Sequence, residues 1–295
     1  MTDHACATNE KVSIVLLTHS RVQELCRTLW HLLDLPEQPP IIVVDNCSID
    51  NTAERVEAVF PTVKLISTER NLGAAGRNLG VDFVQTPYVA FCDDDTWWDP
   101  GALNAAVELL DRHASVSVLN ARIVVGPQQI LDPACAAMAG SPLAYQDEIG
   151  PLLAGFMAGA IVMRTAAFRK AGGYWDGFFI GGEETLLAMD ILDAGGQIAY
   201  APALVVHHWP SHLRHAQQRQ RLTTRNAIWT CWLRLPWPMA WQRTRFLLQQ
   251  LPDRRLRRNA LTDALSGAIQ IVAKRRVLRD ETCQLLSRVW QHDKP

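Results

Sequence analysis

Short apolar segments alternate with amphipathic segments over the first 210 residues of the chain. Runs rich in Val, Ile, Leu and Phe have the length and composition of buried strands, and they cover residues 12–18, 41–44, 63–67, 88–92, 116–125, 156–163 and 199–207. Between these runs, apolar residues recur every three or four positions or follow helix-start signals. These signals predict helices at residues 21–33, 100–112, 165–171 and 183–194, a helix through Val59 that Asp50 could cap, and a helix that ends near Val84. Strands that alternate with helices over such a length are typical of a parallel, doubly wound α/β sheet.

The pattern changes near residue 210. From there to the C-terminus it is helical and rich in arginine, with tryptophans at positions 229, 232, 237, 241 and 290. We therefore expect an α/β domain at residues 1–210 and a basic, Trp-rich helical appendage at residues 211–295. Residues 126–150, which are rich in Pro, Ala and Gly, are expected to form an ordered loop or lid.

Several expected strands carry a polar group at their carboxyl end. Thr18, Asp45, the triplet at residues 93–95 and His207 each end or directly follow an apolar run. Open α/β sheets bind ligands at the carboxyl ends of their strands, so these side chains are candidates for a single active site. Taken singly, each has a simpler interpretation, and Asp45 could cap the turn that follows it.

The triplet Asp93, Asp94 and Asp95 directly follows the apolar run at residues 88–92. Three adjacent carboxylates repel one another strongly unless they are solvated or neutralised by a cation. Because side chains alternate along an extended chain, Asp93 and Asp95 are expected on one side and Asp94 on the other. A hard divalent ion with open positions for phosphate oxygens is the natural partner. The simpler alternative is a solvated acidic turn before a helix that Asp99 caps.

Composition narrows the classes of function and location. The chain has 29 Lys and Arg against 30 Asp and Glu, and it contains no recognisable nucleic-acid-binding module, so no nucleic-acid partner is expected. Seven scattered cysteines without a CxxC pair form neither a zinc pattern nor a disulfide framework, which favours a reducing cytoplasm. Residues 1–11 lack the apolar core of a signal peptide, and the longest apolar run, residues 151–163, is too short to span a bilayer. We expect a soluble or peripheral protein in the cytoplasm.

A glycine-bearing loop at residues 71–80 completes the set of motifs. It matches neither the GxGxxG of dinucleotide-binding folds nor the GxxxxGK[ST] of P-loops, so neither assignment is supported. From Val12 to about Trp209, the chain resembles the family 2 glycosyltransferases, which have the GT-A fold. The resemblance rests on five motifs in order: Val12–Thr18 (VSIVLLT), Val43–Asp50 (VVDNCSID), Asn71–Asn78 (NLGAAGRN), Asp93–Asp95 (DDD) and Gly182–Glu184 (GEE).

This resemblance implies a fold and an activity. It places nucleotide-sugar binding and catalysis in residues 1–210, on a mostly parallel GT-A sheet. The expected reaction transfers a sugar from a nucleotide diphosphate donor of the UDP, dTDP or GDP type, with Mg²⁺ or Mn²⁺ and with inversion at the anomeric carbon. The expected acceptor is a saccharide or a lipid-linked saccharide. The chain also resembles bacterial rhamnosyl- and galactofuranosyl-type transferases, which implies a role in assembling a cell-surface polysaccharide or glycolipid.

The resemblance also implies roles for the residues of a nucleotide pocket. Asp45 would accept a hydrogen bond from a ring N–H of the base, and Thr18 would line the same pocket. Asn71 and Gly73 would allow the backbone to approach the nucleotide closely. Arg77 would reach the pyrophosphate or pair with an acid of the site.

Among the acids, the family pattern implies that Asp93 faces the nucleoside and that Asp95 binds the ion, whereas the role of Asp94 on the nucleotide side stays open. The ion would bridge the diphosphate and offset the charge that develops on the leaving group. His207 matches a histidine that completes the coordination of the ion, and His208 is the neighbouring candidate. For either histidine a structural role is an equal alternative.

A general base must remove the proton of the acceptor hydroxyl. The family places an acidic pair, most often Glu-Asp, at a helix start, with the second acid as the base. Here the pair is Glu183 and Glu184, so Glu184 is the expected base, although Leu186 stands where many members carry another Asp. Two acids in the first turn of a helix could also simply complement its dipole. Trp175 and Asp176 are candidates for contact with the acceptor.

Other interpretations stay open. A sugar-1-phosphate nucleotidyltransferase has a similar α/β layout, but residues 18–21 lack the glycines of its N-terminal loop. A degenerate nucleotide-sugar binding module would fit the unusual Glu-Glu pair. In the C-terminal region, arginines interleave with apolar residues at positions 241–258. That pattern fits either an amphipathic surface at the inner face of an anionic membrane or helices that pack on the catalytic domain.

Overall fold

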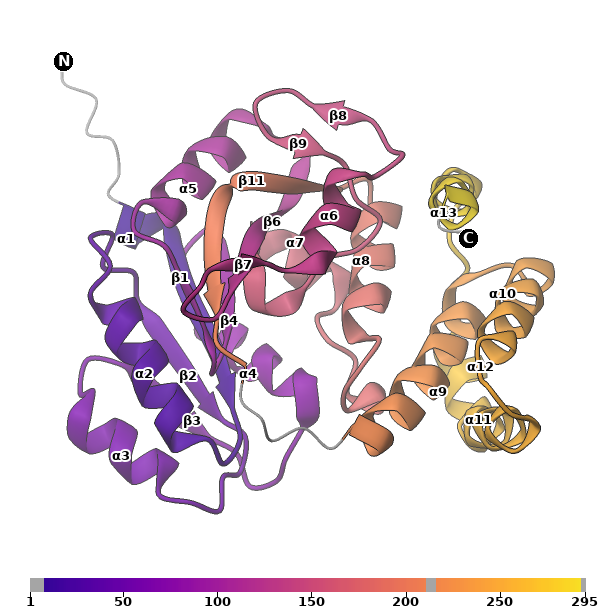
Figure 1. Cartoon of the computed structure of the whole chain (residues 1–295), viewed down its shortest axis with the longest axis horizontal. Helices are drawn as coiled ribbons and strands as arrows, with labels where there is room; N and C mark the ends of the chain where they lie inside the picture. Colours follow the sequence, from indigo (N-terminus) through magenta and orange to yellow (C-terminus); the bar gives the residue numbers. More distant parts are fainter. Residues whose placement is uncertain (1–7, 211–215, 293–295) are drawn as a thin grey trace.

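The computed structural model describes residues 8–210 and 216–292, which are organised around one large sheet (Figure 1). The described strands of this sheet follow the order β3-β2-β1-β4-β10-β6-β11-β5, and β7 pairs with β6. They are β1 (Val12–Thr18), β2 (Ile41–Asp45), β3 (Lys64–Ser67), β4 (Tyr88–Asp93), β5 (Thr96–Trp98), β6 (Val116–Val125), β7 (Ile130–Leu131), β10 (Ile161–Arg164) and β11 (Gln197–His208). A small separate sheet pairs β8 (Tyr145–Gln146) with β9 (Gly150–Pro151).

The large sheet is mixed but mostly parallel. Strand β1 pairs in parallel with both β2 and β4, β2 pairs in parallel with β3, and β11 pairs in parallel with β6. Strands β10, β5 and β7 run antiparallel to their neighbours. The expected α/β class is therefore confirmed. Strand β10 runs antiparallel to both of its neighbours, β4 and β6. Residues 126–160 connect β6 to β10, and this connection is not the single crossover helix that joins parallel strands.

Helices pack around the sheet (Figure 1). They are α1 (Thr8–Lys11), α2 (Val22–Leu33), α3 (Thr52–Val59), α4 (Gly76–Asp82), α5 (Ala102–Arg112), α6 (Pro133–Ala139), α7 (Thr165–Ala171) and α8 (Glu183–Asp193). In α2 the fully buried Leu25, Leu29 and Leu32 form a stripe at helical spacing. The six helices predicted from the sequence in this part correspond to α2, α3, α4, α5, α7 and α8, with small shifts at their ends.

Two predicted segments differ from the structure. The strand expected at residues 156–163 is shorter, because residues Ala158–Ala160 form a 3₁₀ turn and β10 begins only at Ile161. Gly159 lies within this turn and close to Asp93, since a Cβ atom at this position would come within 2.8 Å of an oxygen of Asp93. Residues 126–150 are also more regular than expected and include β7, α6 and β8.

The C-terminal region is helical, as predicted. It contains α9 (Ala216–Arg234), α10 (Trp237–Gln249), α11 (Arg254–Ser266), α12 (Ala268–Lys274) and α13 (Asp280–His292). These helices share a second hydrophobic core with Phe178, Leu186 and Met189 of the α/β part. Arg234 reinforces this contact, because its guanidinium binds the buried Asp190 of α8 through two hydrogen bonds of 2.6 and 2.9 Å. The division at residue 210 stays a prediction, but the two parts pack together directly.

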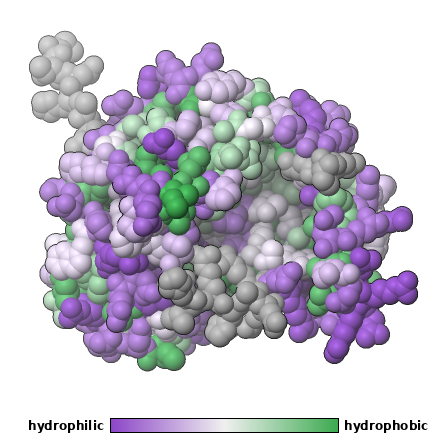
Figure 2. All heavy atoms as spheres, viewed as in Figure 1, coloured by the Kyte–Doolittle hydropathy of each residue, from purple (hydrophilic) through white to green (hydrophobic). Residues whose placement is uncertain are grey.

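The surface of the C-terminal helices is strongly hydrophilic on the face shown at the right of Figure 2, with apolar side chains between the polar ones. Among the described residues, no helix combines the length and the apolar character that crossing a membrane requires.

Candidate active site

The carboxyl ends of β1, β2 and β4 lie side by side and bring the predicted polar residues to one edge of the sheet. In the strand register, Thr18 is opposite Asp45, and Leu17 is opposite Asp93. The hydroxyl of Thr18 donates a hydrogen bond of 3.0 Å to Asp94. Parallel pairing therefore builds the predicted cluster at the place where α/β sheets bind ligands.

The acid triplet is arranged differently from the expected alternation. Strand β4 ends at Asp93, and the chain turns at Asp94 and Asp95 before β5 begins. As a result, Asp94 and Asp95 both bind the guanidinium of Arg21, the latter at 2.9 Å, whereas Asp93 binds Arg77. The prediction that Asp93 and Asp95 point the same way is wrong, because it assumed an extended chain through all three acids.

Arg21 is a site residue that the sequence reasoning missed. It follows the end of β1 by three residues and precedes α2, so its position just beyond a strand end was the available signal. Arg77 on α4, by contrast, was predicted. Its guanidinium is buried beside Asp93 and lies 5.8 Å from the ring of Tyr174. The prediction that Arg77 pairs with an acid of the site agrees with this contact.

The three acids differ in their surroundings. Burial raises the pKa of Asp94 to about 7, against the opposing effect of Arg21. Its carboxylate is already bound by Thr18 and Arg21. Asp95 is also buried, but the side chain of Asp93 is 41% exposed. Asp93 is thus the most accessible of the three to a ligand, and Asp94 serves mainly to hold the site together.

The predicted nucleotide pocket is organised by Asn46, a second residue that the sequence reasoning missed. Its amide nitrogen donates to Asn71 and to the carbonyl of Gly73, both at 2.9 Å, and its oxygen accepts from the N–H of Leu72 at 2.8 Å. The neighbouring Asp45 is buried and accepts a hydrogen bond of 3.0 Å from the N–H of Ser48. Asn46 thereby fixes the glycine-bearing loop next to Asp45.

Gly73 occupies a position that other residues could not take. Its φ is +61°, and a Cβ atom there would lie 1.9 Å from the carbonyl oxygen of Phe179. The next residue, Ala74, donates its N–H to the same oxygen at 2.7 Å. The loop therefore packs backbone against backbone on the segment that leads into α8, which connects the nucleotide pocket to the acidic pair.

The acidic pair Glu183 and Glu184 begins α8, after Gly182 with a φ of +93°. Glu184 accepts a hydrogen bond of 2.8 Å from the N–H of Ala158. Burial, followed by repulsion from Glu183, raises the pKa of Glu184 to about 7, and Arg77 opposes this rise. A carboxyl group with a pKa near neutrality is suited to general-base catalysis, so the geometry brings a candidate base into the field of the same acids and arginines.

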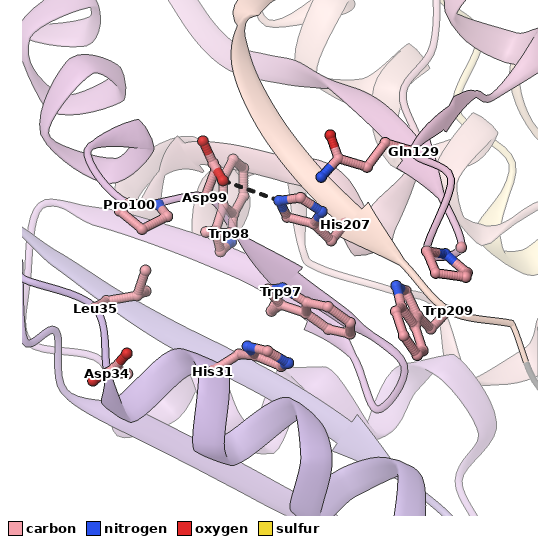
Figure 3. Close-up of a pocket in the computed structure, with 12 residues that line it drawn as sticks. His31, Asp34, Leu35, Trp97, Trp98, Asp99, Pro100, Gln129, His207 and Trp209 are labelled. Carbon is pink, nitrogen blue, oxygen red and sulfur yellow. Dashed lines mark hydrogen bonds and ion pairs between the residues drawn. The ribbon is translucent and has the colours of Figure 1, made fainter.

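The two histidines at the end of β11 point in opposite directions. His208 lies with its Nε2 3.7 Å from Asp95 Oδ1, whereas His207 binds Asp99 at 3.0 Å. His207 lines a pocket of about 400 Å³ together with Trp97, whose ring lies between those of His207 and His31 (Figure 3). The structure does not bring the predicted ligand His207 to the acids, because neighbouring residues of a strand face opposite sides. It brings His208 there.

The two residues predicted to meet the acceptor have different surroundings. Trp175 is partly buried and packs against Phe178 and Trp229, with ring centroids 4.9 and 6.0 Å away. Asp176 is exposed at the start of a short 3₁₀ turn. Trp175 therefore has a packing role of its own, and contact of either residue with an acceptor stays a prediction.

Binding of a divalent ion at the acid triplet stays a prediction. Within the described ranges, no three His, Cys, Asp or Glu side chains are grouped to hold an ion by themselves. Asp95 and His208 nevertheless offer an oxygen and a nitrogen that face each other. Mg²⁺ usually keeps only one or two carboxylate ligands and fills its other positions with water and phosphate oxygens. Asp95 supplies one carboxylate of that kind, and His208 would add a nitrogen ligand.

Comparison with known proteins identifies the family. The sequence matches the family described as Glycosyl transferase family 2 over residues 13–172, which is more than half of the chain. The chain therefore belongs to this family and is a glycosyltransferase. The expectation drawn from the motifs is confirmed, and the interpretations as a nucleotidyltransferase or a binding module receive no support.

Two relatives and one solved structure are similar to the chain. The uncharacterized glycosyltransferase YwdF of Bacillus subtilis is 32% identical over 94 residues, which are 31% of this chain and 35% of that protein. The N-acetylglucosaminyl-diphospho-decaprenol L-rhamnosyltransferase of Mycobacterium tuberculosis is 24% identical over 234 residues, which are 68% of this chain and 76% of that protein. The matched region thus spans about a third of the Bacillus protein.

The crystal structure of GalNAc-T7 with UDP, GalNAc and Mn²⁺ superimposes with a TM-score of 0.63 at 16% identity. The match covers 89% of this chain and 56% of that one. At this level of identity the similarity shows the fold, and the expected GT-A architecture is confirmed.

Proposed function

We propose that this family 2 glycosyltransferase moves a sugar from a nucleotide diphosphate donor to an acceptor hydroxyl, with inversion and with the help of Mg²⁺ or Mn²⁺. The observation that carries the proposal is the meeting of the acid triplet, two arginines and the acidic pair Glu183–Glu184 at one edge of the sheet. Five carboxyl groups against two guanidinium groups make the site acidic. A cation that accompanies a diphosphate would offset its repulsion by these carboxyl groups.

For the donor, the proposed pocket uses the ends of β1 and β2 and the glycine-bearing loop. Asp45 accepts a hydrogen bond from a ring N–H of the base, and Thr18 and Asn71 line the same pocket. Asp93, the most exposed of the three acids, binds the ribose. The base can be that of UDP, dTDP or GDP, since all three offer a ring N–H.

The proposed base is Glu184. The acceptor hydroxyl gives its proton to this carboxylate while its oxygen bonds to the anomeric carbon, and the bond from that carbon to the diphosphate breaks on the opposite face. The charge that the diphosphate gains is met by Arg77 and by the ion. The ion would be held by Asp95 and His208, and when bound it supplies Lewis-acid stabilisation of the leaving group.

The proposed acceptor is a saccharide, and a lipid-linked one is favoured by the charge of the C-terminal region. Residues 211–295 contain seventeen Lys and Arg against five Asp and Glu. Apolar side chains are exposed on the same helices, among them Trp241, Ile269 and Val272. Basic helices with exposed apolar residues fit the surface of an anionic membrane, and the mycobacterial relative is named for a decaprenol-linked substrate.

The membrane contact is tested by flotation with vesicles of phosphatidylcholine alone and of phosphatidylcholine with phosphatidylglycerol. The full chain should float only with the anionic vesicles, and the double variant Ile269→Ser, Val272→Ser should float less. Equal flotation of both proteins, or none with either vesicle, argues against the contact.

The main proposal is tested by thermal shift with nucleotide diphosphates, with and without Mn²⁺. We expect stabilisation that requires both the nucleotide and the ion. His208→Ala should weaken this joint effect, whereas His207→Ala, on the opposite face of β11, serves as the matched control and should retain it. A joint effect lost in the His207 variant and kept in the His208 variant would contradict the proposed ligand. Transfer or hydrolysis of the stabilising nucleotide's sugar conjugates then identifies the donor.

A further inference from the structure

The segment that leads into the acidic pair has an unusual backbone. Phe179, Gly181 and Gly182 have φ angles of +64°, +83° and +93°. Such conformations are costly for Phe and depend on contacts from the surrounding structure to persist. Since Glu183 follows directly, whatever holds this segment also decides where the acidic pair lies.

Asn226 of α9 makes these contacts. Its side chain is fully buried, and its amide nitrogen lies 3.0 Å from the carbonyl oxygens of Phe178 and Ile180 and 2.5 Å from that of Gly181. Three carbonyl groups within residues 178–181 thus face one NH₂ group. An amide is well suited to this task because it offers two N–H donors from one atom.

Arg225 fixes the orientation of that amide. Its Nε and Nη2 atoms donate to Oδ1 of Asn226 at 3.0 and 2.8 Å, so the NH₂ group must face the segment. Nη2 also donates to the carbonyl of Phe178 at 3.2 Å. The guanidinium is itself held, because it lies 4.2 Å from the ring of Trp229.

The segment packs closely against α9 and leaves no space for side chains between them. A side chain at Gly181 would come within 2.5 Å of the hydroxyl of Thr223, and one at Gly182 would come within 3.1 Å of Asn226. On its other side, the carbonyl of Phe179 accepts the N–H of Ala74 from the glycine-bearing loop at 2.7 Å. The segment is therefore clamped between the predicted nucleotide pocket and the C-terminal helices.

We propose that Asn226, oriented by Arg225, is a positioning residue that sets the location of Glu184 relative to the donor. The inference rests on the proposed function, because it assigns Asn226 to the reaction for which Glu184 is the base. It also gives one residue of α9 a positioning role, although α9 lies outside the region that matches the family, residues 13–172.

The test compares Asn226→Ala and Asn226→Asp with Thr230→Val in the full chain. Thr230 is also buried in the same helix, and its hydroxyl donates to the main-chain carbonyl of Asn226 at 2.9 Å, so its removal leaves the side-chain contacts of Asn226 in place. Each protein is measured for kcat, for donor KM and for hydrogen–deuterium exchange in peptides that cover residues 71–77 and 176–186. Loss of positioning by about 1 Å should lower kcat about 100-fold.

We expect both Asn226 variants to lose kcat with little change in donor KM, and to exchange faster in the two peptides. Thr230→Val should retain wild-type kcat and exchange. If Asn226→Ala keeps kcat within about threefold of wild type, or if Thr230→Val loses as much, the inference is wrong.

The experiment also covers two other outcomes, variants that do not fold and a wild-type chain that transfers no sugar. If the Asn226 variants do not fold, Arg225→Lys takes their place, because it keeps the charge but loses the paired donors; unchanged kcat and exchange in this variant would overturn the inference. If the wild-type chain transfers no sugar, the proposed function fails. The exchange data then decide the positioning alone, and unchanged exchange in the Asn226 variants would refute it.

Discussion

Glu184→Gln separates the chemical role of this carboxyl group from its structural role. Glutamine has the same shape and keeps the Oε1 acceptor that binds the N–H of Ala158 at 2.8 Å. It removes the ability to take a proton and the negative charge that the buried site must accommodate. The substitution should therefore abolish turnover and at the same time stabilise the folded protein above neutral pH.

The size of the stability effect follows from the pKa. Burial raises the pKa of Glu184 from 4.5 to about 7 in the folded protein. A carboxyl group whose folded pKa lies above its unfolded value destabilises the fold when it is ionised, and this cost grows between the two pKa values and is constant above the higher one. At about 1.4 kcal/mol per pKa unit, the full cost is about 3 kcal/mol, and partial solvation of the side chain lowers it to about 1–3 kcal/mol.

The assay is thermal unfolding of wild type and Glu184→Gln at pH 4.5 and pH 8. The variant should gain about 2–6 °C relative to wild type at pH 8 and little at pH 4.5, where the wild-type group is protonated in the folded state and about half protonated in the unfolded state. Glu108→Gln, a substitution of an exposed glutamate on α5, is the control and should show no such pH-dependent gain. Loss of a general base should lower kcat by about 10²–10⁴-fold, with nucleotide binding retained.

Two results would refute this reasoning. An equal effect of the substitution at both pH values would mean that burial does not raise the pKa of Glu184. Turnover close to wild type would assign the base to Glu183 or to another group, and Glu183→Gln would then distinguish these. In the wild type, kcat should rise with pH through about 7 as Glu184 loses its proton.

Three other substitutions test the contacts that hold the candidate site and the helix α8 in place. Arg21→Gln removes the counter-charge of Asp94 and Asp95, so Mn²⁺ alone should raise its Tm more than it raises that of wild type. Gly73→Ala places a Cβ atom 1.9 Å from the carbonyl of Phe179 and should cost about 1–3 kcal/mol of stability in urea unfolding, with a loss of turnover. Asp190→Asn disrupts the buried pair with Arg234, which should cost about 3–5 kcal/mol in the same measurement.

Much of the fold could be predicted because its signals are local. Apolar runs of strand length and the helical stripe of α2 depend on neighbouring residues, and they gave the class, the order of elements and the strand ends that carry Thr18, Asp45 and Asp93. The turn at Asp94 could not be predicted, because the pattern of alternation holds only while the chain stays extended. The same limit explains the histidines, since which of two neighbours faces the site depends on the exact register of β11.

Residues that hold the site were harder to find than residues of the motifs. Arg21 and Asn46 act on groups far away in the sequence, such as Asp94, Asp95 and Gly73. Asn226 binds backbone carbonyls 45 to 48 residues away. Hydrogen bonds from a side chain to main-chain carbonyls leave no periodic pattern in the sequence, because every residue has a main-chain carbonyl. The feature that points to the contact of Asn226 is the positive φ of Phe179, which only the three-dimensional structure shows.

The arrangement of charges couples the binding of the ion to the binding of the nucleotide in the proposed mechanism. Without a donor, Arg21 and Arg77 are already bound to the triplet, and the remaining negative charge of the site repels a free diphosphate. A divalent ion alone meets two facing protein ligands, Asp95 and His208, which is too few for tight binding. An ion held by Asp95 and His208 would offset the charge of the acids, and phosphate oxygens of the donor would suit its remaining positions. By linkage, the factor by which the ion tightens nucleotide binding must equal the factor by which the nucleotide tightens ion binding. Independent binding of the two would be incompatible with an ion placed between Asp95 and the donor.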